Sequence, residues 1–394
     1  MAAKTIAELD LQGRRVFIRV DFNVPLTPAG GVSDPARIRA ALPTINHAIE
    51  RGARVVLASH LGRPKGRQRA DMSLLPVAAY LAEALGRDVF LADEPAGDGA
   101  KKVVNDLRDG SVAMLENLRF TPGEETNDEA FARALATYAD VYVNEAFTTA
   151  HRAHASTVGM VKYVSSKGLG FQAEREVKML GKVLGEVERP FVAVLGGTRV
   201  AEKFSLLECL LGRADVVCLG GAMANTFLSA KGVAMGRSLV EPSKLPLARA
   251  FLSKAENSGA RIVLPRDLVV ADDAKAEAGN VVPAATLPDD TAAFDIGPES
   301  AAEIGAALAR ARTVLWNGPM GVCESPAFAG GTLSVARSIA LVMGGTTVVV
   351  GGDSAAAAER AGVATSITHV SAGGNASLEF VEGKKLPGLA ALES

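Results

Sequence analysis

The sequence predicts an α/β protein in which each of two domains contains a parallel sheet flanked by helices. Short β-branched runs alternate along the chain with longer amphipathic stretches rich in Ala and Leu. The short runs do not alternate strictly between apolar and polar residues, which indicates parallel strands buried on both faces. At 394 residues the chain is too long for one ordinary core. It therefore suits two Rossmann-like domains, each a parallel sheet flanked by helices, joined by an interdomain helix.

Each predicted strand is a short apolar run. These runs cover residues 16–20, 54–58, 112–115, 141–143, 191–195, 216–219, 261–264, 313–316 and 346–350. The stretches between them are long enough for crossover helices, among them residues 35–51, 74–86, 128–138, 201–211 and 245–259. Crossovers between parallel strands are right-handed, so the functional loops of each sheet should lie at the carboxyl ends of its strands.

The boundary between the domains falls within residues 165–190. Residues 165–168 resemble a loop, and residues 171–187 then predict one helix with Val177, Leu180 and Leu184 on a shared face. The helix could also lie inside one large domain, but similar strand and helix patterns on its two sides favour a connection between two domains. We expect an N-terminal domain over 1–170, an interdomain helix over 171–187, a C-terminal domain over 188–375 and a C-terminal segment over 376–394.

Composition excludes several classes of protein. Hydrophobic residues make up 48% of the chain and charged residues 22%, which is the balance of compact globular proteins. The net charge of −2 gives no general attraction to nucleic acid or to an anionic membrane. The sequence has neither a transmembrane stretch nor the apolar core of a secretory signal, so we expect a cytoplasmic protein. Cys209, Cys218 and Cys323 lack CxxC spacing, which favours small buried thiols over disulfides or zinc.

Basic residues follow several predicted strands of the first half. RVDFNVPL (19–26) leaves the first strand, SHLGRPKG (59–66) the second, and ENLRF (116–120) and AHRAHA (150–155) later ones. One arginine alone is usually a solvated surface charge, but repetition at one sheet edge favours a binding site for a small polyanion. Arginine suits this role because its planar fork binds carboxylate and phosphate bidentately. The candidate ligands are Arg37, His60, Arg63, Arg119 and Arg152.

The histidines of the first half predict substrate orientation rather than proton transfer or metal binding. His60 could be a general base, but an acceptor that is already ionised at neutral pH, such as a carboxylate, needs none. Hydrogen bonding to the substrate is therefore the better role for His60. His151 and His154 flank Arg152 at a spacing that suggests a metal, yet no third ligand is evident nearby, so we expect no zinc site.

Gly-rich turns follow the predicted strands of the second half. Glycine permits close backbone approach, and free N–H groups at a helix N-terminus favour phosphate. A single Gly-Gly pair is weak evidence, but repetition at strand ends predicts a phosphate-binding domain. Lys203 adds a mobile positive charge, and Asp353 adds a carboxylate suited to Mg²⁺ beside nucleotide phosphates. The turns are GGTRVAEK (196–203), GGAM (220–223), NGPMG (317–321), GGDS (351–354) and GGNA (373–376).

These two kinds of crevice predict phosphoryl transfer between two bound anions. That chemistry depends mainly on positioning and charge neutralisation. Neither GxxxxGK[ST] nor GxGxxG is present, so neither a P-loop nor a dinucleotide fingerprint explains the glycines. Separate domains also imply closure around the substrates, which would expel water that could hydrolyse the product.

The sequence resembles the phosphoglycerate kinase family in the segments RVDFNVPL, ASHLGRPKG, LENLRF, AHRAHAS, WNGPMGV and ASLEF, and the similarity extends from about Arg15 to the C-terminus. The resemblance implies reversible phosphoryl transfer between ATP and the carboxylate of 3-phosphoglycerate, giving 1,3-bisphosphoglycerate and ADP, in glycolysis, gluconeogenesis or the Calvin cycle. It implies an N-terminal domain that binds phosphoglycerate and a C-terminal domain that binds MgATP or MgADP. It also implies that the C-terminal segment returns to the N-terminal domain and that the protein is a monomer. From the net charge and the lack of a spanning stretch we expect no nucleic-acid or membrane partner.

The resemblance also implies roles for individual residues. Those expected to bind phosphoglycerate are Asp21, Phe22, Asn23, Arg37, His60, Leu61, Gly62, Arg63, Arg119 and Arg152. Those expected to bind the nucleotide are Gly197, Lys203, Gly220, Gly221, Asn317, Pro319, Glu324, Gly351, Gly352, Asp353 and Ser354, with Asp353 also holding Mg²⁺. Those expected to act on the transferring group are Arg37, Arg199, Lys203, Gly373 and Gly374.

Departures from the family pattern fall on the nucleotide and transfer side. The family usually reads GGAKVSDK where this chain has GGTRVAEK, so Arg199 replaces a lysine. The usual NDAFG is NEAFT at 144–148, and the usual STGGGA is SAGGNA at 371–376. Val350 precedes the GGD motif in place of glycine, and Cys323 stands where phenylalanine is common. A guanidinium does not simply replace a compact ammonium, and Asn375 adds a side chain near a phosphate-binding turn.

These departures leave two alternatives to the kinase open. A paralogue would phosphorylate a related phosphorylated or phosphonate carboxylic acid. A weakly active binding protein would keep the fold and lose efficient transfer. The intact basic cluster fits both the kinase and the paralogue, and the altered transfer loop gives the paralogue some support. The retained Lys203, Asp353 and Glu324 argue against the binding protein.

Overall fold

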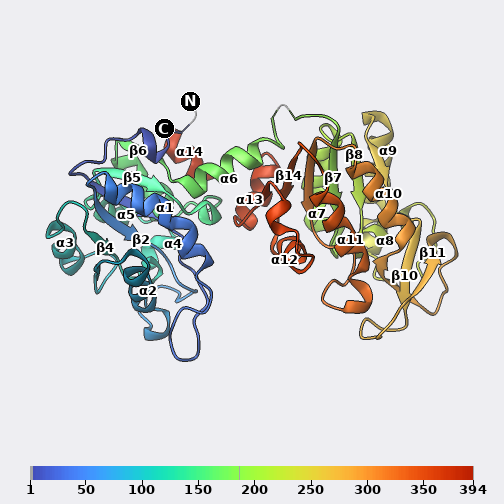
Figure 1. The fold of residues 1–394 in the computed structure, drawn as a ribbon, viewed down its shortest axis with the longest axis horizontal. Helices are drawn as coiled ribbons and strands as arrows, with labels where there is room; N and C mark the ends of the chain where they lie inside the picture. Colours follow the sequence, from blue (N-terminus) through green and yellow to red (C-terminus); the bar gives the residue numbers. More distant parts are fainter. Residues whose placement is uncertain (1–2, 186, 394) are drawn as a thin grey trace. The chain divides into compact units, whose positions relative to one another are not determined.

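The computed structural model describes residues 3–185 and 187–393. The chain divides into two compact units (Figure 1). Unit 1 comprises Met1–Lys178 together with Lys385–Ser394, and unit 2 comprises Met179–Lys384. Each unit is described separately below.

Unit 1 is built on a parallel sheet with the strand order β3-β4-β2-β1-β5-β6. The strands are β1 (Arg15–Arg19), β2 (Arg54–Ala58), β3 (Val89–Leu91), β4 (Val112–Met114), β5 (Val141–Asn144) and β6 (Ser166–Leu169). Alternate residues of β1 face opposite sides of the sheet, and Val16, Phe17 and Ile18 are all fully buried. Burial on both faces explains the continuous apolar runs in the sequence.

Helices surround this sheet. They are α1 (Ala36–Glu50), α2 (Leu75–Leu85), α3 (Asp98–Asn105), α4 (Pro122–Glu125), α5 (Glu129–Ala136), the first part of α6 (Phe171–Gly181) and α14 (Pro387–Glu393). Ile38 and Ile45 of α1, seven residues apart, pack in the same core as Val16 and Val55. Their spacing places them on one face of the helix, as the amphipathic pattern predicts.

Unit 2 is built on a second parallel sheet, with the order β15-β14-β13-β7-β8-β9. Its strands are β7 (Phe191–Leu195), β8 (Val216–Leu219), β9 (Arg261–Val263), β13 (Thr313–Asn317), β14 (Thr346–Val349) and β15 (His369–Val370). Its helices are α7 (Val200–Leu211), α8 (Gly221–Ala230), α9 (Leu245–Ser258), α10 (Pro298–Leu308), α11 (Gly330–Ala340), α12 (Gly352–Arg360) and α13 (Asn375–Val381). The prediction of two parallel sheets flanked by helices is thus confirmed.

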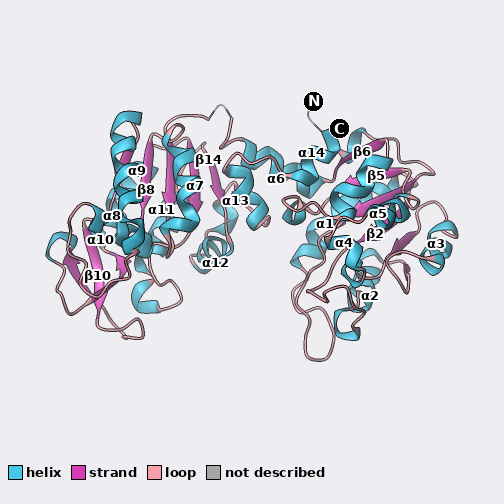
Figure 2. Ribbon diagram, turned by 180° about the vertical axis from the view of Figure 1, so that it is seen from behind, coloured by secondary structure: helices cyan, strands magenta, loops and turns pink. Residues whose placement is uncertain are grey.

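Unit 2 also contains an antiparallel sheet that the sequence analysis missed. It has the order β11-β10-β12, formed by β10 (Asp267–Ala271), β11 (Asn280–Pro283) and β12 (Ala292–Ile296) (Figure 2). A small core of its own includes Leu268, Val270 and Leu287. The edge strand β11 is mostly exposed, so it lacks the buried apolar run that marks the other strands.

Two predictions near the end of unit 1 were wrong. Residues 165–168 are not a loop, because β6 covers Ser166–Leu169 and pairs with β5. Glycine is needed at position 168, since a Cβ there would lie 2.7 Å from the Lys4 carbonyl oxygen. The helix expected over 171–187 ends at Gly181, where glycine weakens helix formation.

The C-terminal segment that packs in unit 1 begins later than expected. Helix α13 belongs to unit 2, and the return to unit 1 starts at Lys385 rather than at residue 376. Helix α14 then packs beside β6, where Figure 1 shows it in red. The Gly388 N–H donates to the Ala150 carbonyl oxygen at 2.8 Å, and a Cβ at position 388 would lie only 3.0 Å from the Ala150 Cα.

A buried carboxylate caps the first turn of α6. Glu145 accepts hydrogen bonds from the Thr44 hydroxyl at 2.7 Å and from the backbone N–H groups of Gln172 and Ala173 at 3.1 and 3.3 Å. Gly170 leaves room for it, because a Cβ there would lie 2.1 Å from Glu145 Oε2. Burial raises the pKa of Glu145 from 4.5 to about 7, although the donors oppose that shift.

This raised pKa predicts a pH-dependent effect of Glu145→Gln on stability. Between about pH 4.5 and 7 the folded wild type holds a proton that the unfolded chain has lost, so its stability falls as pH rises. Glutamine does not titrate, so the variant lacks this pH-dependent loss of stability. The urea midpoint of the variant should therefore rise relative to that of the wild type between pH 5 and pH 8.

Glu129→Gln is the matched control. Glu129 is exposed, and its hydrogen bond from Arg133 lowers its pKa, so this carboxyl is mostly ionised in both the folded and the unfolded protein between pH 5 and 8. If the urea midpoints of Glu145→Gln and wild type differed by the same amount at pH 5 and pH 8, Glu145 would be ionised in the folded protein at both pH values.

Candidate active site

Loops at the carboxyl edge of the unit 1 sheet interlock. The Phe22 N–H, after β1, donates to the Ser59 hydroxyl, after β2, at 2.8 Å. Asn23 Oδ1 accepts from the Gly62 N–H at 2.9 Å. The Gly62 carbonyl oxygen in turn accepts from Arg119 Nη1 at 2.8 Å. These bonds bring three of the predicted segments to one edge, as the parallel topology requires.

Asp21 holds one of the predicted arginines in place. Its Oδ2 accepts from Arg37 Nη1 at 2.6 Å, and its Oδ1 accepts from the Asn23 N–H at 3.1 Å. The Thr148 hydroxyl also donates to Asp21 Oδ2 at 2.6 Å. Arg37 lies in the first turn of α1, and 44% of its side-chain surface is exposed. The remaining N–H groups of its guanidinium are therefore accessible.

The predicted cations lie close enough to affect one another electrostatically. His60 is buried, and its pKa falls well below 6.5 because of burial and because Arg19, Arg119 and Arg37 are near. Burial also lowers the pKa of Arg119, and the charges of Arg19 and Arg152 contribute to the same shift. A neutral histidine thus lies among several fixed positive charges, an arrangement that suits a small anion with more than one negative charge.

A buried layer beneath this cluster was missed by the sequence analysis. Arg19 is almost fully buried; its Nε donates to Ser156 Oγ at 2.8 Å, and its Nη2 lies 3.2 Å from His60 Nδ1. Glu124 is fully buried and accepts from the Ser156 N–H and hydroxyl at 3.0 and 2.5 Å. Burial raises the pKa of Glu124, while Arg19 and Ser156 oppose that shift. An arginine inside an otherwise apolar strand was the available signal.

Some predicted ligands have side chains in the core. Phe22 and Leu61 belong to the hydrophobic core of unit 1, so only their backbone atoms are available to a ligand. Arg63 is exposed, and Arg152 Nε donates to His151 Nε2 at 3.2 Å.

Burial and the neighbouring Arg19 and Arg119 lower the pKa of His154 to about 4. Across residues 3–185 and 187–393, no His, Cys, Asp or Glu cluster could hold a metal ion by itself.

In unit 2, three Gly-rich turns pack against one another at the carboxyl edge of the sheet. Gly318 has φ +97°, and a Cβ there would lie 2.3 Å from the Gly196 carbonyl oxygen. Gly221 has φ +65°, and its Cβ would lie 2.5 Å from the Gly197 carbonyl oxygen. The repeated glycines therefore allow the backbones after β7, β8 and β13 to touch.

Lys203 and Asn317 connect these turns to the loop after β14. Lys203 Nζ donates to Asn317 Oδ1, and Asn317 Nδ2 donates to the Val350 carbonyl oxygen at 2.6 Å. Burial lowers the pKa of Lys203, and the negative charges of Glu202 and Asp353 oppose that shift. The Ser354 hydroxyl at the start of α12 accepts from the Gly318 N–H at 2.6 Å. A cation, an amide and two helix N-termini thus surround the same loops.

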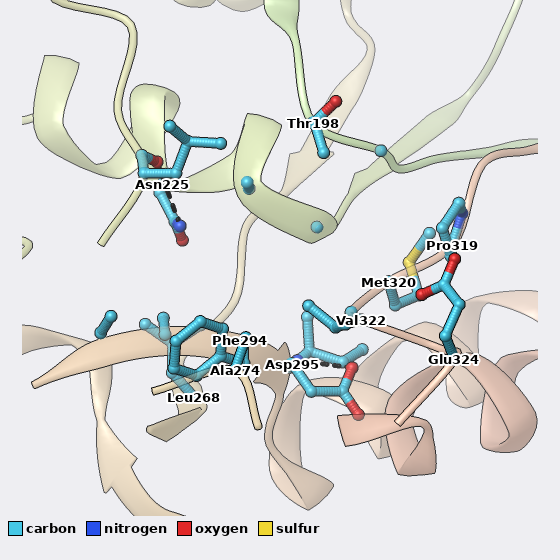
Figure 3. Close-up of a pocket in the computed structure, with 18 of the residues that line it drawn as sticks. Thr198, Asn225, Leu268, Ala274, Phe294, Asp295, Pro319, Met320, Val322 and Glu324 are labelled. Atoms are coloured by element: carbon cyan, nitrogen blue, oxygen red, sulfur yellow. Dashed lines mark hydrogen bonds between the residues drawn. The ribbon is translucent and has the colours of Figure 1, made fainter. Parts of the chain in front are cut away.

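A cavity of about 630 Å³ opens beside these turns (Figure 3). Figure 3 shows Asn225 on one side and Phe294 and Leu268 on the other. The predicted nucleotide residues that line it are Gly197, Gly221, Pro319, Glu324 and Asp353. The predicted residues outside its lining are Lys203, Gly220, Asn317, Gly351, Gly352 and Ser354. Its size and its mixture of apolar and polar walls suit a small organic ligand.

The antiparallel sheet supplies a wall of this cavity that the sequence analysis did not identify. Phe294 and Asp295 of β12 both line the cavity. Asp295 accepts from the Ile296 and Gly331 N–H groups at 2.9 and 2.7 Å, and burial raises its pKa to about 7. A Cβ at Gly331 would lie 2.6 Å from Asp295 Oδ1. This fit depends on tertiary packing and leaves no short motif in the sequence.

The residues expected to act on the transferring group lie outside the cavity lining. Arg199 is the N-cap of α7; 67% of its side chain is exposed, and its Nη1 lies 3.2 Å from Glu202 Oε1. Gly374 precedes α13 with φ 57° and ψ −126°, a conformation that glycine adopts readily. The Gly373 N–H donates to the Ser371 hydroxyl at 3.2 Å, and Asn375 is exposed as the first residue of α13.

The sequence matches the family model described as phosphoglycerate kinase over residues 6–384. The chain belongs to the phosphoglycerate kinase family. It is 56% identical to the phosphoglycerate kinase of Anaeromyxobacter dehalogenans strain 2CP-C over 396 aligned residues, with full coverage of both chains. It is 53% identical to that of Moorella thermoacetica, covering 100% of this chain and 99% of the relative.

Solved structures of phosphoglycerate kinases have the same fold. The structure from Coxiella burnetii superposes with a TM-score of 0.93 at 37% identity, covering 99% of each chain. That from Pyrococcus horikoshii superposes with a TM-score of 0.80 at 32% identity, covering 100% of this chain and 98% of the other. The family consists of phosphotransferases with a carboxyl group as acceptor. In the described part of the chain, no helix is long and apolar enough to span a membrane.

The close packing at Gly318 predicts that Gly318→Ala is strongly destabilising. The new Cβ would collide with the Gly196 carbonyl oxygen, and φ +97° is unfavourable for alanine. We expect a loss of about 2–4 kcal/mol in the free energy of unfolding, measured by urea denaturation. Trp316, the only tryptophan, donates its indole N–H to the Gly318 carbonyl oxygen at 2.9 Å, so its fluorescence should report the local change.

Gly212→Ala is the matched control. Gly212 has φ −88° at the end of α7, and a Cβ there would meet no atom within 4 Å. It should therefore change stability by less than about 1 kcal/mol. Equal effects at positions 212 and 318 would contradict the proposed packing constraint.

Proposed function

We propose that this chain transfers a phosphoryl group reversibly between ATP and the carboxylate of 3-phosphoglycerate, giving ADP and 1,3-bisphosphoglycerate. The supporting observation is the cationic cluster of unit 1, in which neutral His60 lies near Arg37 and Arg119, and Arg119 in turn lies near Arg152. A phosphorylated carboxylic acid carries its charge at two ends, and several guanidinium groups match that distribution. Membership of a family with a carboxyl acceptor supports the same substrate class.

His60 orients the acid in this proposal. Arg19 Nη2 is always a hydrogen-bond donor, so the His60 Nδ1 that lies 3.2 Å from it acts as the acceptor. Neutral His60 then carries its proton on Nε2 and can donate to an oxygen of the substrate; this tautomer is inferred from the hydrogen bond. The acceptor carboxylate is already ionised and needs no general base.

The cavity of unit 2 holds the nucleotide in this proposal. Leu268, Phe294 and Val322 provide apolar walls for the base, and Glu324 is positioned to bind the ribose. The N-termini of α8 and α12 direct N–H groups toward the phosphates. Gly197, Gly220, Asn317, Pro319, Gly351, Gly352 and Ser354 complete the proposed nucleotide site.

Asp353 fits a role in holding Mg²⁺ with the phosphates. Its carboxylate is exposed in the first turn of α12 and lines the cavity, and one carboxylate with phosphate oxygens and water is a usual ligand set for this ion. When bound, Mg²⁺ neutralises phosphate charge and fixes phosphate geometry. Lys203 of α7 adds a further positive charge beside the same loops.

Transfer forms a bond between a carboxylate oxygen of the acid and the γ-phosphorus, and breaks the bond from that phosphorus to the β–γ bridging oxygen. In our proposal Arg37, Arg199 and Lys203 neutralise the equatorial oxygens, and the N–H groups near Gly373 and Gly374 bind them. Domain closure around both substrates excludes water from this step. We also propose that the protein is a cytoplasmic monomer that acts in central carbon metabolism.

A coupled assay with purified protein tests the function. With ATP, Mg²⁺ and 3-phosphoglycerate, we expect turnover of about 10 s⁻¹ or more, and loss of turnover when EDTA removes the metal. Binding of 3-phosphoglycerate without turnover would indicate a binding protein. No binding of 3-phosphoglycerate, together with turnover of a phosphonate or another phosphorylated acid, would indicate the paralogue.

Arg199→Lys tests the departure in the transfer loop. The arginine is exposed and paired with Glu202, whereas a lysine presents a compact ammonium. We expect kcat to rise several-fold, up to about tenfold, with little change in the KM for 3-phosphoglycerate. Arg310→Lys, a change at an exposed arginine between α10 and β13, should leave both constants unchanged. An unchanged or lower kcat in Arg199→Lys would mean that Arg199 is already well fitted to the transition state.

A further inference from the structure

The Thr148 side chain contacts the substrate site through one carboxylate oxygen. Thr148 lies in the short helix η4 (Phe147–Thr149), where the family pattern described above has glycine. We propose that Thr148 is a positioning residue for the phosphoglycerate site, whose hydroxyl fixes Asp21 and thereby orients Arg37. This inference rests on the proposed function, because it assigns a role within the same site.

Asp21 joins three segments of unit 1. Its Oδ2 accepts from the Thr148 hydroxyl and from Arg37 Nη1, both at 2.6 Å. Its Oδ1 accepts from the Asn23 N–H at 3.1 Å. The loop after β1, the first turn of α1 and the turn after β5 therefore meet at this carboxylate. Only 9% of the Asp21 side chain is exposed, against 44% of Arg37, so the carboxylate is the fixed member of the pair.

Thr148 offers its hydroxyl from a rigid turn. The Thr149 and Ala150 N–H groups donate to the Ala146 and Phe147 carbonyl oxygens, each at 3.0 Å. The Thr149 hydroxyl donates to the Ala146 carbonyl oxygen, also at 3.0 Å. Threonine is stiff at χ1 because it is branched at Cβ. A glycine at position 148 would leave Asp21 Oδ2 without this donor.

Fixing Asp21 prepares Arg37 for an anion. Arg37 uses Nη1 for the carboxylate, and the rest of its fork of five N–H groups stays accessible to a ligand. Ordering a long, half-exposed side chain before binding reduces the entropy that binding must overcome. The Thr148 hydroxyl and Arg37 both donate to Asp21 Oδ2. Because the hydroxyl takes up part of the negative charge of that oxygen, Asp21 competes less strongly with the substrate for the Arg37 guanidinium. Both effects strengthen binding of the acid.

The experiment measures 3-phosphoglycerate binding by isothermal titration calorimetry, without nucleotide, on the full chain. Thr148→Val keeps the shape but removes the hydroxyl, and Thr148→Gly restores the family residue. Both should weaken binding about tenfold, the range expected for one hydrogen bond to a charged group. Thr148→Ser keeps the donor and should bind within about twofold of wild type. In the coupled assay the KM for ATP should not change in any of these variants.

Thr149→Val is the matched control. It removes a hydroxyl from the same turn, but that hydroxyl contacts Ala146 rather than Asp21. It should therefore leave the affinity for 3-phosphoglycerate unchanged. A loss equal to that of Thr148→Val would show that the turn itself, and not the bond to Asp21, is responsible, and would overturn the inference.

A double variant tests whether Thr148 acts through Asp21. Asp21→Ala alone should weaken binding, and adding Thr148→Val should then cost less than about twofold more, because alanine has already removed the acceptor of the Thr148 hydroxyl. Fully additive losses would overturn the inference. So would wild-type affinity in Thr148→Val, which leaves the proposed function intact. Absence of binding by the wild-type chain would instead overturn the proposed function and this inference with it.

Discussion

Contact between loops at the carboxyl edge of a parallel sheet is the constraint on which the rest of both units depends. Parallel strands bring these loops to one edge, but hydrogen bonds between them decide where each side chain points. In unit 1, hydrogen bonds of 2.9 and 2.8 Å join Gly62 to Asn23 and to Arg119. In unit 2 the bonds from Lys203 to Asn317 and from Asn317 to Val350 have the same effect. The sheets bring the loops together, and the hydrogen bonds between the loops fix the positions of their side chains.

The two units meet the cost of buried charge in different ways. Unit 1 places Arg19 and Glu124 beneath its cation cluster, and both contact Ser156. Arg19 of this layer lies beside His60 Nδ1. Burial, together with the charge of Arg19 and its neighbours, lowers the pKa of His60, so its ring presents a donor rather than another fixed charge. Unit 2 relies instead on backbone N–H groups, which need no counter-charge and require glycine where the chains touch. A free acid with separated charges and a nucleotide phosphate chain suit these two solutions respectively.

The sequence predicted the parts of the structure that leave a local pattern. The central strands of both sheets are continuous apolar runs, and burial on both faces explains why they could be found. The edge elements β6 and β11 could not be found in this way, because β6 contains Gly168 against the chain at Lys4 and β11 is mostly exposed. The basic and Gly-rich segments were found as motifs. Glu124, Phe294 and Asp295 were not, since their roles depend on what the fold packs against them.

The departures from the family pattern are informative because the structure gives them different surroundings. Arg199 and Asn375 are exposed, so their effect must arise when a ligand reaches them. Thr148 and Glu145 already contact partners within unit 1: Thr148 bonds to Asp21, and Glu145 bonds to Thr44 and the first turn of α6. Both lie in the NEAFT segment that follows β5, within four residues of each other. That one segment therefore connects the anion site, through Asp21, with the start of the helix that leads out of unit 1. A change in this segment can therefore move Asp21, and through it Arg37, without replacing either residue. The proposed phosphoglycerate site can be adjusted in this way while every residue that would touch the substrate stays the same.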